Sequence, residues 1–141
     1  MKDLETARAC ADMMYANDTA SRALGIEIEI PEPGSAVATM TVRNDMTNGF
    51  DICHGGLVFT LADTAFAFAC NAYDDVTVAG SGTIEFLRPS VAGDELRAVA
   101  LEEHRGKRSG VYAVEVVNQR KEFVALFRGR AVARGQSLLE S

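Results

Sequence analysis

The stretch Asn48–Asn71 constrains the fold of this chain most, because a glycine-containing turn leads directly into an almost wholly apolar segment. After Gly56, apolar side chains occupy every side of a 3.6-residue period, and such a helix belongs in the interior of a domain. The segment is too short to cross a membrane, because roughly 17 residues with a polar centre fall short of the ~20 mainly apolar residues that a span needs. The sequence therefore predicts one long central helix that the rest of the domain encloses.

Asp63 is the exception within this helix, since it is the only charged residue there. A buried carboxylate is costly unless it is paired or hydrogen-bonded. Between Arg43 and Arg88 the sequence contains no Lys or Arg, so a local salt bridge is excluded. Two interpretations remain. Asp63 is either a structural carboxylate bonded to a backbone turn or to a distant Arg, or a carboxylate kept in a pocket for chemistry.

The turn before this helix bears on the choice. Gly55 and Gly56 let a ligand approach the first free N–H groups of the helix. The helix dipole favours developing negative charge at that end, so these N–H groups can stabilise an oxyanion. One helix therefore carries both a candidate oxyanion donor and a candidate catalytic carboxylate.

Length and charge narrow the class of protein. With 141 residues the chain is expected to form a single domain, residues 1–141. Its 14 basic and 20 acidic residues give a net charge of −6, which disfavours nucleic acid or an anionic membrane surface as the main partner. We expect a cytoplasmic protein, because the first residues contain no continuous apolar segment of the signal-peptide type.

The three cysteines, Cys10, Cys53 and Cys70, are expected to be reduced thiols. Their odd number and the lack of CxxC spacing argue against a disulfide framework and against a zinc site. Cys53 stands next to His54, which suggests a cysteine hydrolase, but adjacent residues seldom point at each other as a nucleophile and its base must.

Periodicity predicts the remaining elements. A surface helix is expected from Asp3 to about Asn17 within an N-terminal segment 1–20, and the tail 136–141 is expected to be mobile. Alternating or apolar runs bounded by turn residues predict strands at 26–30, 36–43, 76–87, 95–103, 110–118 and 123–133. A hairpin, a buried helix and four consecutive strands imply an α+β fold, with an antiparallel sheet curled around the central helix.

These residues resemble the hot-dog-fold acyl-CoA thioesterases, and within them the PaaI-type enzymes associated with phenylacetate degradation. The resemblance covers roughly residues 24–134. An HGG turn followed at fixed spacing by LAD in an apolar helix is specific, whereas HGG alone is weak. The matching motifs are Asn48-Gly49, Cys53-His54-Gly55-Gly56, Leu61-Ala62-Asp63-Thr64-Ala65-Phe66-Ala67, Thr83-Ile84-Glu85-Phe86-Leu87-Arg88-Pro89, Gly110-Val111-Tyr112 and Val124-Ala125-Leu126-Phe127-Arg128-Gly129.

The resemblance implies hydrolysis of the thioester between an acyl group and coenzyme A, without a metal or cofactor. Asp63 would act as the nucleophile or as the general base on water. The N–H of Gly55 would polarise the carbonyl, and Asn48 matches the position that holds the attacking group or water. Ser81 matches a supporting hydroxyl, and His54 matches the position that orients the substrate or the turn.

The spacing adds a requirement of its own. Asp63 lies eight residues after Gly55, so on a straight helix the two are about 12 Å apart along the axis, too far for one thioester to touch both. We expect Gly55, His54 and Asn48 from one subunit to meet Asp63 and Ser81 from the facing one, in a symmetric dimer at least. The resemblance further implies a tetramer, as a dimer of dimers.

Basic side chains are the candidates for binding the coenzyme A phosphates. The turn 104–108 is rich in basic residues, and Lys107 and Arg108 there are either phosphate ligands or parts of a solvated turn. Arg88 and Arg128 are further candidates.

Two other functions fit a chain of this fold. An acyl-thioester hydratase or dehydratase needs an acid and a base at one carbon, usually a His with a carboxylate, whereas a non-catalytic acyl-CoA-binding module would keep the pocket but would not need Asp63. The acyl group is not determined by the motifs. The resemblance implies aryl-acetyl thioesters, including ring-hydroxylated ones.

Overall fold

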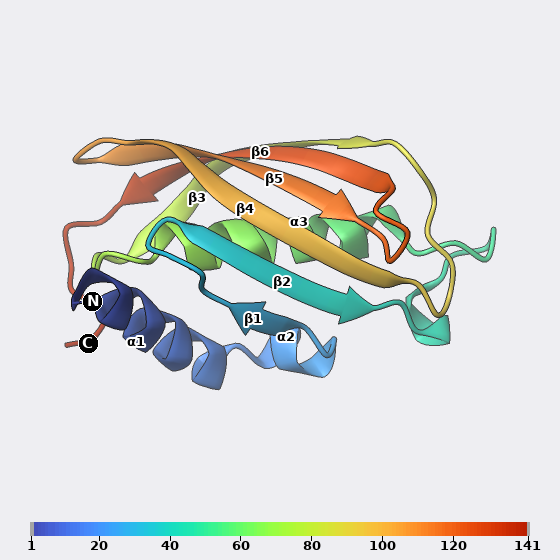
Figure 1. Cartoon of the computed structure of the whole chain (residues 1–141), viewed down its shortest axis with the longest axis horizontal. Helices are drawn as coiled ribbons and strands as arrows, with labels where there is room; N and C mark the ends of the chain where they lie inside the picture. The colour runs from blue at the N-terminus through green and yellow to red at the C-terminus, as the bar shows by residue number, and fades with distance from the viewer. Residues whose placement is uncertain (1, 141) are drawn as a thin grey trace.

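The computed structural model describes residues 2–140, in which one antiparallel sheet curls around a long helix (Figure 1). This is the α+β architecture expected from the sequence, and none of the described helices is long and apolar enough to cross a membrane. In chain order the elements are α1 (Lys2–Asn17), α2 (Thr19–Ala23), β1 (Glu27–Glu29), β2 (Ser35–Thr41), the 3-10 helix η1 (Asn44–Met46), α3 (Gly55–Cys70), β3 (Thr77–Phe86), β4 (Glu95–Arg105), β5 (Ser109–Val117) and β6 (Phe123–Ala133).

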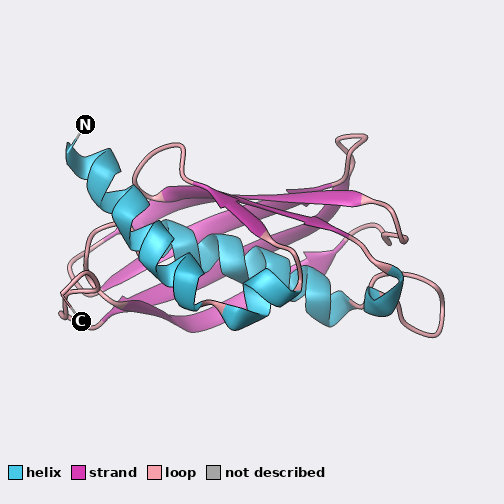
Figure 2. Ribbon diagram, turned by 90° about the horizontal axis from the view of Figure 1, so that it is seen from below, coloured by secondary structure: helices cyan, strands magenta, loops and turns pink. Residues whose placement is uncertain are grey.

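The six strands form a single sheet in the order β1-β2-β4-β5-β6-β3, with every neighbouring pair antiparallel. The strands β4, β5 and β6 are consecutive, so short turns join them, whereas β3 precedes them in the chain and lies beside β6. Both α1 and α3 lie on the same side of the sheet (Figure 2). We call that side the inner face and the opposite side the outer face.

The core lies between α3 and the inner face. Along β5, Tyr112, Val114 and Val116 are buried while Glu115 between them is exposed, as expected of a strand with one covered face. Phe66 of α3 packs against Tyr112, with the ring centroids 5.6 Å apart. Burying an aromatic side chain of this kind contributes about 1.5–3 kcal/mol, so these layers hold the helix in place.

One face of α3 is not covered by its own sheet. Gly56 is exposed, and Thr60, Asp63 and Ala67 are half-buried, whereas most other residues of the helix are buried. These four residues recur at helical spacing and form one stripe along the axis. The sequence pattern had predicted a helix enclosed on all sides. The single chain leaves this stripe of small and polar residues open, with Asp63 near its middle.

The two edges of the sheet differ. At the β1 edge, side chains of α1 bind outward-facing carbonyls: Tyr15 Oη donates to Ile26 O (2.7 Å) and Arg8 donates to Ile30 O (3.3 Å). At the other edge β3 is ten residues long, and no strand of the described chain lies beyond it. Val78 and Phe86 on β3 are exposed apolar residues. A long edge strand of this kind is a template for pairing with another chain.

Two short helices were not expected from the sequence. Helix α2 begins after Asp18, whose carboxylate accepts hydrogen bonds from the N–H (2.9 Å) and Oγ (2.7 Å) of Ser21. Helix η1 has only three residues. Elements of three to five residues contain too few positions for hydrophobic periodicity to reveal them.

The C-terminal tail is attached to the domain. Asp74 Oδ1 accepts hydrogen bonds from Ser137 Oγ (2.9 Å) and from the N–H groups of Leu138 (2.9 Å) and Leu139 (2.8 Å), and Leu138 is buried. These contacts argue against the mobile tail expected for 136–141, and they hold the pKa of Asp74 below its usual range. Met1 and Ser141, the outermost residues of the expected terminal segments, lie outside the described residues.

Candidate active site

A hydrogen-bonded loop leads into α3. Asn48 Oδ1 accepts from the N–H groups of Phe50 (2.9 Å) and Ile52 (3.4 Å), and the Asn48 N–H donates to Ile52 O (2.8 Å). Phe50, at the tip, is 85% exposed. The side-chain oxygen of Asn48 therefore shapes the loop. Its Nδ2 donates to no described residue. This nitrogen is therefore the side-chain atom of Asn48 that remains available for the predicted role of holding water or the attacking group.

His54 and Gly55 begin the central helix. His54 is the N-cap residue, but its imidazole makes no capping hydrogen bond and is exposed, so it is not merely a capping side chain. Its N–H donates to Met46 O (2.8 Å). The N–H groups of Gly55 and Gly56 have no acceptor within the described part of the chain. They are therefore available as donors to an oxyanion, as the sequence predicted.

Asp63 sits in the middle of the open stripe. Its carboxylate forms no ion pair or hydrogen bond with any residue between 2 and 140, so neither structural partner considered from the sequence is present in the chain. Burial raises the pKa of Asp63 above its ordinary value. A half-buried carboxylate without a cation is the group that the chemical interpretation requires.

The structure does not bring all of the predicted residues together. Helix α3 runs uninterrupted from Gly55 past Asp63, so the separation of about 12 Å along the axis holds within one chain. Ser81 pairs with Arg130, and its neighbour Gly82 lies on the inner face, where a Cβ would meet Phe127 at 3.0 Å. Ser81 therefore lies on the outer face. This register disfavours a supporting hydroxyl for Asp63, a role that stays a prediction.

The buried cysteines are not activated. Burial raises the pKa of Cys53, and the pKa of Cys70 rises to about 12 for the same reason. The Sγ of Cys53 faces the carbonyl of His54 (3.7 Å), not the imidazole. A Cys53–His54 nucleophile pair is therefore not formed, in agreement with the sequence argument. Within residues 2–140 no group of three or more His, Cys, Asp or Glu could hold a metal ion.

The basic turn lies at the opposite end of α3 from Gly55. Arg105, just before the turn, donates to the carbonyl of Cys70 (2.9 Å) at the end of the helix and lies 5.0 Å from the Tyr73 ring centroid. Arg105 is therefore a structural residue. Lys107 and Arg108 are exposed on the turn itself, about 24 Å along the helix from Gly55 of the same chain.

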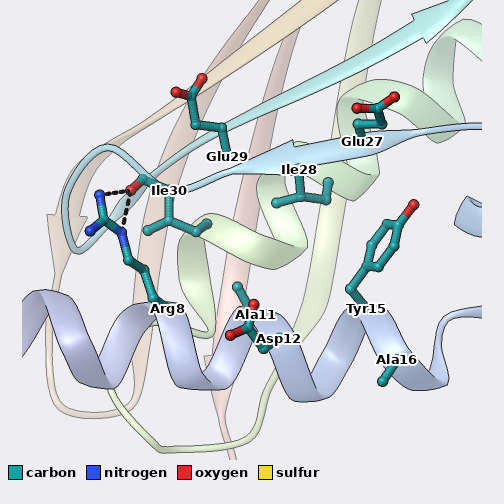
Figure 3. Close-up of a pocket in the computed structure, with 9 residues that line it drawn as sticks. All are labelled: Arg8, Ala11, Asp12, Tyr15, Ala16, Glu27, Ile28, Glu29 and Ile30. Atoms are coloured by element: carbon teal, nitrogen blue, oxygen red, sulfur yellow. Dashed lines mark hydrogen bonds between the residues drawn. The ribbon is translucent and has the colours of Figure 1, made fainter.

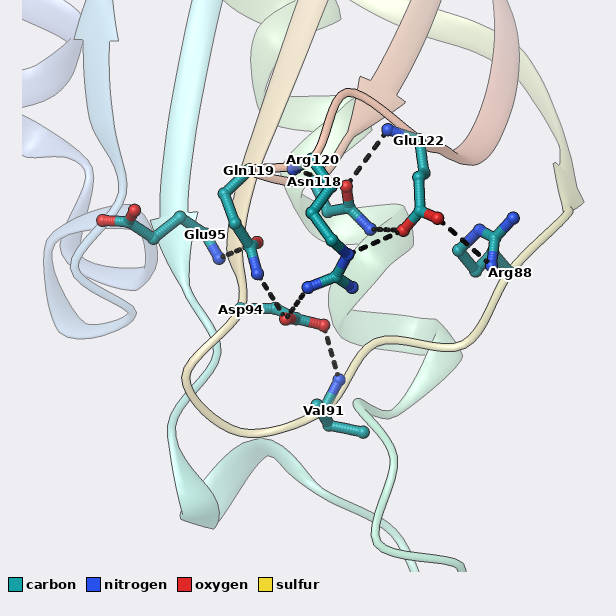
Figure 4. Close-up of polar contacts among 8 residues, drawn as sticks. All are labelled: Arg88, Val91, Asp94, Glu95, Asn118, Gln119, Arg120 and Glu122. Carbon is teal, nitrogen blue, oxygen red and sulfur yellow. Dashed lines mark hydrogen bonds and ion pairs between the residues drawn. The ribbon is translucent and has the colours of Figure 1, made fainter.

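The two other basic candidates have acidic partners. Arg88 lies 3.6 Å from Glu122, within a cluster of polar contacts around the β5–β6 turn (Figure 4). Arg128 lies 3.0 Å from Glu103. Both guanidinium groups remain at least half exposed, so these ion pairs are weak and exchangeable. Arg88 comes two residues after the end of β3, whereas Arg128 lies on the outer face.

A groove of about 790 Å³ lies away from these residues, between α1 and β1 (Figure 3). It is lined by Arg8, Tyr15 and Ile28 among others, and it contains none of the residues predicted from the sequence. The polar tips of Arg8 and Tyr15 are already bonded to backbone carbonyls. The groove therefore has no part in the chemistry of α3.

Phe86 is the residue that sequence reasoning missed. A Cβ added to Gly55 would lie 3.2 Å from Phe86 Cζ, so the tip of this ring rests on the start of α3. Phe86 stood within a matched motif but received no role. Alternation along β3 groups Phe86 with Gly82 and Ile84 on one face, but only the packing shows that this face meets the helix.

Comparison with known proteins identifies the family of this chain. The thioesterase superfamily matches residues 50–125, more than half of the chain, and this range contains His54, Gly55 and Asp63. The chain therefore belongs to the thioesterase superfamily and is a thioester hydrolase of the hot-dog fold.

Within that superfamily it is of the PaaI type. The chain is 54% identical over 121 residues to the acyl-coenzyme A thioesterase PaaI of Escherichia coli K12, covering 86% of each protein. The solved structure of E. coli PaaI, from the phenylacetic acid degradation operon, superposes with a TM-score of 0.93 at 50% identity, covering 95% of this chain and 97% of that one. A hypothetical thioesterase protein from Streptococcus pneumoniae TIGR4, solved with coenzyme A, has a TM-score of 0.81 at 25% identity, covering 88% of this chain and 98% of that one.

Asp63→Asn is expected to make the fold more stable at neutral pH. Because burial raises the pKa of the folded carboxyl, the folded state binds the proton more tightly, and the free energy of unfolding falls as pH rises from about 3.9 through the folded pKa. Asn does not titrate. The Tm advantage of the variant should be absent at acid pH, grow across this window and then level off. A Tm difference that is the same at every pH would contradict the assigned cause.

Proposed function

We propose that this protein hydrolyses acyl-CoA thioesters in a site shared between two subunits. The observation that carries the proposal is the half-buried Asp63 carboxylate, which lacks any cation in the described chain and lies on the open stripe of α3. The unpaired N–H groups at the start of the same helix supply the matching oxyanion donors. Similarity to E. coli PaaI supports the same reaction class.

The shape of the single chain supports the shared site. An open stripe of small residues on α3 and an open edge on β3 can be covered together by a second copy, related by a two-fold axis. Two antiparallel α3 helices whose axis passes near Phe59 would bring Asp63 of one level with Gly55 of the other, because 59 is the midpoint. A Cβ built on Gly82 of β3 would lie 3.5 Å from the Phe59 ring, so β3 runs beside this level of α3 in the same chain.

The chemistry divides among these residues. Asp63 either takes a proton from water as the water oxygen attacks the thioester carbon, or attacks that carbon itself and forms an anhydride that water then cleaves. The Gly55 N–H stabilises the oxyanion in both routes, and Asn48 and His54 orient the water or the substrate. The C–S bond breaks and coenzyme A leaves as a thiolate. The thiolate takes up the proton that water releases, passed on by Asp63 in the first route or set free when water cleaves the anhydride in the second, and the acyl group leaves as a carboxylate.

For the acyl group we infer aryl-acetyl thioesters, including ring-hydroxylated ones. The support is the similarity to PaaI, whose structure is described as that of a phenylacetic acid degradation operon protein. Thiol release from a panel of aryl and alkyl acyl-CoA thioesters tests this inference. The highest kcat/KM should fall on the aryl-acetyl members. A new double-bond absorbance would favour the hydratase alternative, and binding without turnover would favour the binding module.

Lys107 and Arg108 are the proposed ligands for the coenzyme A phosphates. An antiparallel partner brings its own basic turn toward the first subunit's helix start, which the single chain cannot do. Changing both residues to Ala should raise KM several-fold and weaken its salt dependence, with kcat nearly unchanged. Arg22→Ala with Arg97→Ala removes the same charge from exposed positions elsewhere and serves as the control. An unchanged KM would mean that the turn is only solvated.

Further parts of the proposal concern the assembly and its surroundings. We propose a dimer as the minimal active unit and a tetramer as a dimer of dimers, which the mass in solution tests. The reaction as written needs only water and side chains of the protein, so activity should survive dialysis against a chelator. A cytoplasmic location stays a prediction.

A further inference from the structure

The strand β3 places an aromatic ring directly on the candidate oxyanion site. The three nearest atoms to a Cβ built on Gly55 all belong to Phe86: Cζ at 3.2 Å, Cε1 at 3.5 Å and Cε2 at 3.6 Å. The outer edge of the ring therefore points at the first turn of α3. Gly55 has no positive φ, so its backbone conformation would accept a larger residue. What a larger side chain would meet is the Phe86 ring.

Burial in the core does not explain this position. Phe86 pairs with Ala125, which is buried on the inner face, yet Phe86 itself remains 55% exposed. Most large aromatic side chains on an inner sheet face are buried against the helix, as Phe127 is. Phe86 thus presents apolar surface to the space next to Gly55 rather than to the core.

That space is within reach of an acyl group bound at Gly55. If the Gly55 N–H binds the carbonyl oxygen, the carbonyl carbon is within about 4 Å of the N–H, and the first carbon of the acyl group is one bond further. A ring attached to that carbon then comes within reach of Phe86. Aromatic pairs prefer offset-stacked or edge-to-face arrangements, so the part of the Phe86 ring that does not rest against Gly55 can pair with a second aromatic ring.

We propose that Phe86 is a specificity-determining residue, whose ring forms a wall of the acyl pocket beside Gly55 and favours aromatic acyl groups over saturated ones of the same shape. The proposal rests on the thioesterase function and deepens it by naming a residue that selects the substrate. Such an aromatic pair changes kcat/KM by several-fold to roughly tenfold, because the ring contact adds to simple burial of area.

The test compares two thioesters that differ only in aromaticity, phenylacetyl-CoA and cyclohexylacetyl-CoA. Phe86→Leu keeps an apolar side chain but removes the ring. We expect the ratio of kcat/KM values, phenylacetyl over cyclohexylacetyl, to fall about three- to tenfold in Phe86→Leu.

A matched control lies on the other side of the same strands. Leu126 is exposed to a similar degree and pairs with Glu85, one position away from the Phe86–Ala125 pair but on the outer face. Leu126→Ala should leave the ratio unchanged. A geometric check uses Gly55→Ala, whose new methyl group meets the Phe86 ring. Adding Phe86→Leu to Gly55→Ala should recover part of the activity on cyclohexylacetyl-CoA.

The possible results distinguish a failure of this inference from a failure of the proposed thioesterase function. An unchanged ratio in Phe86→Leu, in a variant with the wild-type mass in solution, would overturn the role of Phe86 while the wild-type enzyme still hydrolyses both thioesters. A loss of the dimer with equal losses on both thioesters would also overturn it, because Phe86 would then be a subunit contact only. If the wild-type protein releases no thiol from any acyl-CoA, the proposed function itself fails.

Discussion

Asp63→Asn should leave the protein folded and lower kcat by at least ~10²-fold. Asn has nearly the same volume and needs no ionic partner, so the half-open position on α3 accepts it without strain. It cannot take a proton from water or attack the thioester carbon effectively. Because the side chain of Asp63 contacts no partner within residues 2–140, its replacement breaks no hydrogen bond or ion pair in the described chain.

The measurement is thiol release under saturating substrate, together with a thermal melt of each variant. Asp45→Asn is a suitable control, because Asp45 is an exposed carboxylate paired with Arg43 (3.0 Å) outside the site. It should retain wild-type kcat. If folded Asp63→Asn turned over at a rate close to wild type, Asp63 would be neither the base nor the nucleophile.

A mixture of two inactive variants should regain activity. Asn48→Ala removes the oxygen that shapes the loop next to Gly55. The defect therefore lies at the start of α3 in the same chain. Asp63→Asn removes the carboxylate in the middle of the helix. If these two regions meet across a two-fold axis, a mixed dimer has one site with both lesions and one site with neither.

The expected recovery follows from random assembly. Equal amounts of the two variants, unfolded and refolded together, make about half of the dimers mixed, and each mixed dimer has one intact site of two, so activity should reach roughly a quarter of wild type. If Asn48 and Asp63 served the same site from one chain, every site would carry a lesion. Verified hybrids with no activity would then refute the shared site.

Several features of the fold were predictable because they repeat along the chain. The alternation Ile26, Ile28, Ile30 predicted the strand around β1, and the unbroken apolar period after Gly56 predicted α3. The turns at Gly93-Asp94 and 119–122 marked the ends of β4, β5 and β6 to within a few residues. Such signals depend only on neighbours in the sequence, so they can be recognised without knowledge of tertiary contacts.

Features that depend on contacts between distant residues were not predictable. Leu138 is held by Asp74, which lies 64 residues away. The sequence of the tail therefore did not indicate that it is attached to the domain. The outer-face position of Ser81 follows from an irregularity at Gly80 in the pairing of β3 with β6, and one extra residue in a strand changes the face of everything beyond it. The register also places Arg128 3.0 Å from Glu103, a contact that the sequence did not indicate, and its role in phosphate binding stays a prediction.

The sequence by itself determined the chemical groups of the site: a lone carboxylate on an apolar helix, eight residues after a glycine turn with free N–H groups. Those depend on residue type and helical spacing, which are local properties. Only the tertiary structure decided which face of α3 stays open and which ring rests on Gly55, because both follow from how β3 and α3 pack. Packing joins residues far apart in the chain, and no local pattern encodes that geometry.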